Sequence, residues 1–156
     1  MLLNVVLKKR NVAALVAACS MLCSAADADL FVAFAGKYPA QVLNIESAQI
    51  VYLEADIWTG SARRFRVTLP GIAVPEDTRD APVCQRELAA KAMTVTQDFL
   101  ANAEKIEVHD IKMENSGSEE AIAPIFTDKG GLGEALIAEG LARPDSVDPS
   151  EPWCAD

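Results

Sequence analysis

Three arginines stand close together in the chain, at positions 63, 64 and 66, and are candidates for contact with an anion. A guanidinium group suits phosphate because its fork of N–H donors matches two phosphate oxygens. Side chains alternate along a strand, so Arg66 and Thr68 are expected on the same face. Arg66 is therefore a possible phosphate contact. Arg63 and Arg64 fit the commoner pattern of solvated charges at the entry to a strand.

Other groups with chemical potential are scattered along the chain. Glu46, Asp77 and Asp80 offer the hard oxygen atoms that a divalent cation prefers, but they form no defined ligand set, so no metal site is predicted. His109 has no Ser or Cys nucleophile pattern near it and is expected at a strand surface. The glycine-rich stretch 130–133 lacks the lysine of a phosphate loop and predicts a turn before a helix.

The first 28 residues have the pattern of a signal peptide for export. Basic residues at 8–10 precede the uncharged apolar run 12–23, and the small residues at 26–28 suit a leader peptidase. The run is shorter than the roughly 20 apolar residues that span a bilayer. The predicted location is periplasmic or secreted, with no transmembrane span in the mature chain. A lipoprotein attached through Cys19 is the alternative, because residues 16–19 resemble a lipobox.

Removal of this leader would leave two of the four cysteines. Cys84 and Cys154 would remain as a pair in an oxidising compartment, and we predict a disulfide between them. A two-cysteine metal site is the alternative, but His109 is the only histidine and offers it no further partner. The bridge would close a loop of about 70 residues, for which the chain-entropy model gives roughly 4 kcal/mol of stabilisation.

Length and charge limit the classes of function. The chain has 156 residues, of which 51% are hydrophobic and 24% charged, as in globular proteins. One domain is expected over residues 29–156. The net charge is −9, and it becomes −11 without the leader, which holds three basic residues and one acidic residue. A surface of that sign repels polyphosphate, so nucleic acid is not the expected partner.

The positions of these residues depend on a small set of predicted strands and helices. Alternation and β-branched content predict strands over 41–45, 49–57, 63–69, 105–111 and 121–127, with Pro124 marking the last one as an edge or a bulge.

Two helices complete the pattern. An apolar stripe of helical period predicts a helix over 85–101, formed by Leu88, Ala92, Val95 and Phe99. A short helix over 131–139 ends at Gly140. This order of elements predicts an α+β fold, a five-stranded Greek-key barrel of the OB type with the long helix after the third strand.

Four segments of the chain carry a family pattern. VTLPGIAVPE at 67–76 is similar to V-R-L-x-G-I-D-x-P-E, and LGEALIAEGLARP at 132–144 is similar to V-N-x-A-L-V-x-x-G-L-A-R. CQRELA at 84–89 is similar to the start of the first helix in exported relatives, and PWC at 152–154 to their closing P-W-C. In this order, the segments resemble the staphylococcal nuclease-like (thermonuclease) family over about residues 36–154. The resemblance implies the same OB-type barrel.

The resemblance also implies where an active site would lie. Active relatives hydrolyse phosphodiesters with a Ca²⁺ held by two aspartates, a glutamate that positions water and two arginines that hold phosphate. The aspartate positions fall on Ala48 and Ala73, and the arginine positions fall on Thr68 and near Glu120. Only the glutamate, Glu76, is retained.

These replacements argue against phosphodiester hydrolysis by this chain. Removing one pre-organised donor of transition-state charge costs roughly 3–4 kcal/mol, and here two arginines and both metal carboxylates are replaced together. No arginine lies between Arg86 and Arg143, so the second arginine is absent in any local alignment.

Two hypotheses from different classes follow. The leading one is an exported, non-catalytic binding or structural module without a cofactor, whose protein partner in the envelope or periplasm has a basic or mixed surface. The alternative is an extracellular metal-dependent nuclease or phosphodiesterase with a site rebuilt from Glu76 and Arg66. Only the alternative requires Ca²⁺.

Overall fold

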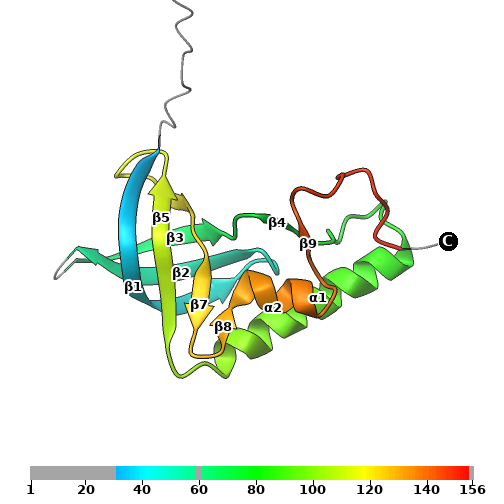
Figure 1. Ribbon diagram of the computed structural model, residues 1–156, viewed down its shortest axis with the longest axis horizontal. Helices are drawn as coiled ribbons and strands as arrows, with labels where there is room; N and C mark the ends of the chain where they lie inside the picture. Colours follow the sequence, from blue (N-terminus) through cyan, green and yellow to red (C-terminus); the bar gives the residue numbers. More distant parts are fainter. Residues whose placement is uncertain (1–30, 59–60, 155–156) are drawn as a thin grey trace, which may run out of the picture.

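The computed structural model describes residues 31–58 and 61–154 (Figure 1). The predicted signal peptide, including Cys19, lies outside the described residues. The elements in chain order are β1 (Val32–Ile45), β2 (Ile50–Trp58), β3 (Ser61–Thr68), β4 (Ile72–Ala73), α1 (Val83–Ala101), β5 (Ile106–Met113), β6 (Glu120–Ile122), β7 (Ile125–Thr127), β8 (Gly130–Gly131), α2 (Leu132–Ala138) and β9 (Arg143–Pro144). No helix in the described ranges is long and apolar enough to cross a membrane.

Five strands close into a barrel of mixed strand direction. Figure 1 shows the curved sheet that they form. β2 pairs antiparallel with β1 and β3, β3 pairs parallel with β6, and β5 pairs antiparallel with both β6 and β1. β7 and β8 continue the sheet beyond β5. The predicted α+β class and OB-like barrel are therefore confirmed.

β1 is longer than predicted, and its extra length closes the barrel. The sequence predicts a strand over 41–45 only, whereas β1 begins at Val32 and pairs with β5 through residues 32–39 before pairing with β2. Gly36 lies at a register shift in the β1–β5 ladder with a φ of 127°, and its N–H donates to Asp110 Oδ1 at 2.9 Å. This bulge bends β1, and the strand continues on both sides of it.

The core is the inside of the barrel. Val51, Leu53 and Ala55 of β2 alternate with outward residues and are at most 1% exposed. Phe65, Val67 and Leu69 are buried on the same side, as the sequence predicts. Alternation of apolar and polar residues therefore decides which face of each strand is available for a surface site.

The predicted strand over 121–127 is wrong in one respect, because it is two strands. β6 pairs with β3 and β5, whereas β7 pairs with β5 and β8. Pro124 lies between them and has no N–H to donate to a ladder. Its carbonyl oxygen accepts the N–H of His109 at 3.1 Å, which holds the break beside β5.

The helices pack at one end of the barrel, and α1 continues past it (Figure 1). The predicted stripe is confirmed, because Ala92 is fully buried and Leu88, Val95 and Phe99 pack against the core. The fully buried Thr96 Oγ1 donates to the carbonyl oxygen of Ala48 at 3.2 Å, which ties α1 to the turn between β1 and β2.

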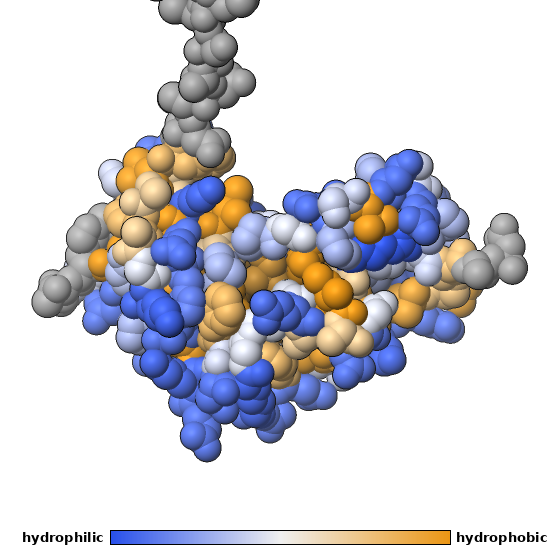
Figure 2. All heavy atoms as spheres, in the orientation of Figure 1, coloured by the Kyte–Doolittle hydropathy of each residue, from blue (hydrophilic) through white to orange (hydrophobic). Residues whose placement is uncertain are grey.

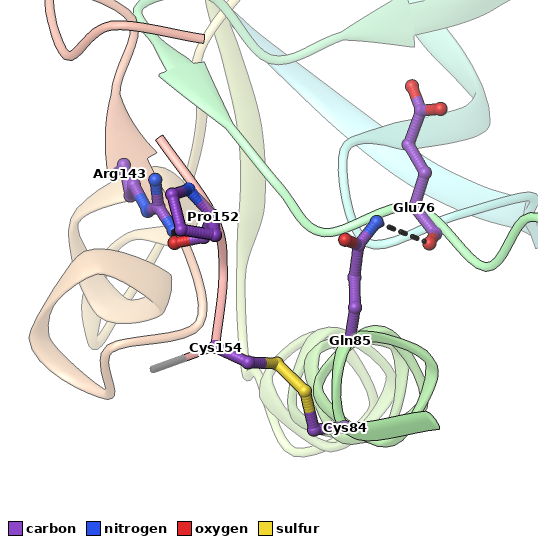
Figure 3. Close-up of a disulfide and its surroundings, with 6 residues drawn as sticks. All are labelled: Glu76, Cys84, Gln85, Arg143, Pro152 and Cys154. Atoms are coloured by element: carbon purple, nitrogen blue, oxygen red, sulfur yellow. Dashed lines mark hydrogen bonds between the residues drawn. A yellow bond between two sulfur atoms is a disulfide. The ribbon is translucent and has the colours of Figure 1, made fainter. Parts of the chain in front are cut away.

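The C-terminal tail is fastened back onto the start of α1. The predicted Cys84–Cys154 disulfide is present, with a Cα–Cα distance of 6.4 Å (Figure 3). Arg143 donates to the carbonyl oxygens of Glu151 at 2.9 Å and Pro152 at 2.6 Å, and its guanidinium lies 3.9 Å from the centre of the Trp153 ring. Figure 2 shows this tail as a mainly hydrophilic surface, separated from the barrel by apolar surface.

Candidate functional site

Arg66 is held between two carboxylates on the outside of the barrel. Its Nε and Nη2 atoms both lie 2.9 Å from Glu46 Oε2, and its Nη1 atom lies 2.7 Å from Glu120 Oε1. The side chains of Arg66 and Glu46 are 39% and 35% exposed, whereas that of Glu120 is 73% exposed. We call these three residues the arginine clamp.

Three elements far apart in the sequence position the clamp. Phe65 and Val67 point into the core, so Arg66 between them points outward from β3. The parallel register places Arg66 opposite Glu120 at the start of β6, where Ser118 Oγ accepts the N–H of Glu120 at 3.1 Å. Glu46 lies in the β1–β2 turn, where its N–H donates to the carbonyl oxygen of Ile50 at 3.0 Å.

The clamp changes what Arg66 can do. Two carboxylates and one guanidinium carry a net charge of −1, and each of the three guanidinium nitrogen atoms lies within 2.9 Å of a carboxylate oxygen. A phosphate group at Arg66 would compete with these two carboxylates and would lie beside their negative charge.

The two neighbouring arginines also have partners within the protein. Arg64 Nε lies 2.7 Å from Glu54 Oε2 on the adjacent strand β2, and this hydrogen bond raises the pKa of the Arg64 guanidinium above its ordinary value. Arg63 donates to the carbonyl oxygen of Ser116. The whole predicted arginine cluster is thus engaged by acceptors of the same chain.

The positions aligned with catalytic residues do not all meet. Ala48 is 5% exposed and covered by α1, and Ala73 is exposed in β4, where it pairs with Arg143 of β9. Glu76 is exposed in the connection before α1, and its carbonyl oxygen accepts a hydrogen bond from Gln85 Nε2 at 3.1 Å. Figure 3 shows the Glu76 carboxylate turned away from Gln85.

Two surface grooves lie beside the clamp. The first, the barrel groove, has a volume of about 590 Å³ and is lined by Thr68 and Glu120, together with Lys112 and Ile122. The second, the helix groove, has a volume of about 550 Å³ and is bounded by the β1–β2 turn, the segment 74–78 and α1. Glu46 lines the helix groove, so the clamp joins a residue of one groove to a residue of the other.

The helix groove combines apolar and acidic residues. Glu46, Glu76 and Asp77 are its acidic residues. Its apolar lining consists of Ile50, Val74, Pro75, Ala89, Ala90 and Met93. The groove therefore offers carboxylates beside an aliphatic surface.

Sequence reasoning missed the pairing that organises the site. It treated Glu46 as a possible cation ligand and Arg66 as a possible phosphate contact, but strand register brings the two side chains together. In the part of the chain that the structure describes, no three His, Cys, Asp or Glu side chains are grouped to hold a metal ion. The His109 side chain is 14% exposed and stacks on Phe126, with 4.3 Å between the ring centres. His109 is therefore more buried than the predicted position at a strand surface.

No family model matches the chain, and no curated protein sequence matches it. The class that the fold defines is an OB-like α+β barrel with a disulfide-fastened tail.

Proposed function

We propose that this chain is an exported, catalytically degenerate relative of the thermonuclease family that acts as a non-catalytic protein-binding module in the envelope or periplasm. The proposal includes no cofactor. Its support comes from the residues quoted for the resemblance, the OB-like barrel and the chemistry of the clamp.

The arginine clamp carries the proposal. Phosphodiester hydrolysis needs cationic groups aimed at the charge that develops on phosphorus. Here Arg66 is 2.7 Å from a carboxylate oxygen of Glu120 and 2.9 Å from one of Glu46, so its charge is already compensated. Carboxylates at this place repel the same substrate that an arginine would attract.

The partner is proposed to be a protein with a basic or mixed surface. The mature chain would have a net charge of −11, which disfavours nucleic acid and favours cationic surfaces. In OB barrels, grooves between strands and loops serve as binding surfaces for partners.

A digestion assay tests the absence of catalysis. Purified protein is incubated with single-stranded DNA and with RNA in the presence of Ca²⁺, Mg²⁺ or Mn²⁺, beside the Glu76→Ala variant. We expect no cleavage above background from either protein. Cleavage by the original chain that disappears in Glu76→Ala would overturn the proposal and support a nuclease with a rebuilt site.

Calorimetric titration separates the same two functions without a turnover assay. A rebuilt nuclease would bind a divalent cation at micromolar concentration, and a nucleoside diphosphate would compete for the site. We expect neither signal up to millimolar Ca²⁺. Micromolar Ca²⁺ binding that Glu76→Ala abolishes would contradict the non-catalytic assignment.

A further inference from the structure

The helix groove is lined by half-buried apolar side chains on its inner surface and by acids that face solvent. Ile50, Val74 and Met93 are half-buried, and Pro75 is buried. Glu76 and Asp77 are exposed. A ligand in this groove would therefore meet aliphatic surface below and negative charge at the edge.

Two of the three acids of the groove, Glu76 and Asp77, lack a cationic partner among the described residues, whereas Glu46 is paired with Arg66. The groove lining includes no lysine, arginine or histidine among the described residues. Glu46 shares Arg66 with Glu120, and the described part of the chain has no ion pair to Glu76 or Asp77. The negative charge of Glu76 and Asp77 is consequently available to an external cation.

A second groove continues this acidic surface. The tail groove has a volume of about 390 Å³ and shares Val74 and Glu76 with the helix groove. Its other acids are Asp148 and Glu151 of the C-terminal tail. Its arginine, Arg143, is committed to the Trp153 ring and to two carbonyl oxygens, as described above.

We infer that the helix groove binds an extended segment of a partner protein in which lysine or arginine alternates with an aliphatic residue. The inference rests on the proposed function and names the chemistry of its partner. In an extended segment, successive side chains point to opposite sides, so an aliphatic residue enters the groove. The neighbouring lysine or arginine begins on the opposite side, and its long stem lets the charged group bend back to the acids at the edge. Charge complementarity selects this ligand, because an anionic segment would meet Glu46, Glu76 and Asp77.

Fluorescence anisotropy with a labelled Lys-Leu-Lys-Leu-Lys-Leu peptide tests the inference on the oxidised protein. We expect saturable binding that weakens as NaCl rises from about 50 to 300 mM, because exposed charges are screened over this range. A Lys-Ser peptide of the same charge and length should bind at least about fivefold more weakly, and a Glu-Leu peptide should not bind.

Two pairs of variants locate the binding. The double variant Glu76→Gln with Asp77→Asn should weaken Lys-Leu binding about fivefold. Its control, Asp98→Asn with Glu139→Gln, removes the same charge from exposed positions outside the groove and should change the affinity less than twofold.

A bulky side chain tests the groove sterically, and Ala90→Arg should block peptide binding. Its control is Gln97→Arg, which adds the same side chain to another exposed position of α1. Unchanged melting temperatures would show that the variants fold.

The outcomes separate this inference from the proposed function. Three results would overturn the groove as the binding site. They are equal affinity for the Lys-Leu and Lys-Ser peptides, an equal loss of affinity in the groove and control variants, and the absence of any Lys-Leu binding. The non-catalytic function would stand in each case if the digestion assay remains negative. Glu76-dependent cleavage of nucleic acid would overturn the function instead.

Discussion

Arg66 illustrates how the environment of one side chain decides its chemistry. A guanidinium on an outward-facing strand position has the donors to bind phosphate. Between Glu46 and Glu120 it becomes the centre of a surface ion-pair network with a net negative charge. Exposed ion pairs contribute little stability individually, so the clamp matters more for the charge that it presents than for the energy of the fold.

The coupling between Arg66 and Glu46 can be measured with a double-mutant cycle. The variants are Arg66→Met, Glu46→Gln and their combination, unfolded in urea. We expect a coupling of about 0.5 kcal/mol that decreases in high salt, because both side chains are more than a third exposed. Additive single effects, with no coupling at low salt, would contradict the observed geometry.

β1 is the element on which closure of the barrel depends. It pairs with β5 through its first half and with β2 through its second half, so one strand belongs to both sides of the closing seam. The bulge at Gly36 lies within the β1–β5 ladder, before the change of partner between Pro39 and Ala40, and its N–H is bonded to Asp110 of β5. Asp110 itself has a φ of 46°, so the distortion involves both strands.

A glycine-to-alanine pair tests the conformation at this bulge. Gly36 has a φ of 127°, which an L-residue adopts with strain, so Gly36→Ala should lower the free energy of unfolding by about 1–2 kcal/mol. The control is Gly133→Ala in α2, where the new Cβ would lie 3.6 Å from Ile72 Cγ2, an ordinary contact. That change should be neutral or stabilising by up to about 1 kcal/mol. Equal effects in urea unfolding would contradict the strained bulge.

The molecule as a whole is a barrel with its two ends of chain fastened in different ways. The start of the described chain enters the barrel as β1, whereas the end is attached to α1 by the disulfide and by Arg143. The tail also forms one wall of the tail groove. The disulfide that stabilises the fold therefore also holds the acidic residues of the tail groove in place.

Reduction of Cys84–Cys154 should lower the melting temperature by about 5 °C or more. The bridge joins residues 70 positions apart, and its loss restores chain entropy to the unfolded state. The measurement is a thermal melt by circular dichroism with and without reductant. The double variant Cys84→Ser with Cys154→Ser should melt at the reduced value under both conditions. An unchanged melt after complete reduction would remove the bridge from this account.

Local patterns in the sequence were sufficient for much of the fold. The apolar stripe from Leu88 to Phe99 predicts α1, and the buried alternation around Phe65 predicts β3. The disulfide follows from the two cysteines outside the predicted leader. These features depend on neighbours within a few residues or on residue type, so they are visible before folding.

The arrangement of the candidate site came from contacts between distant segments. Arg66 meets Glu46 and Glu120, which are 20 and 54 positions away, because β3 pairs with β2 on one side and with β6 on the other. Periodicity places each of these side chains on a face of its own element but says nothing about the register between strands. Register is decided by packing the barrel core as a whole, and it brings Arg66, Glu46 and Glu120 together in the arginine clamp.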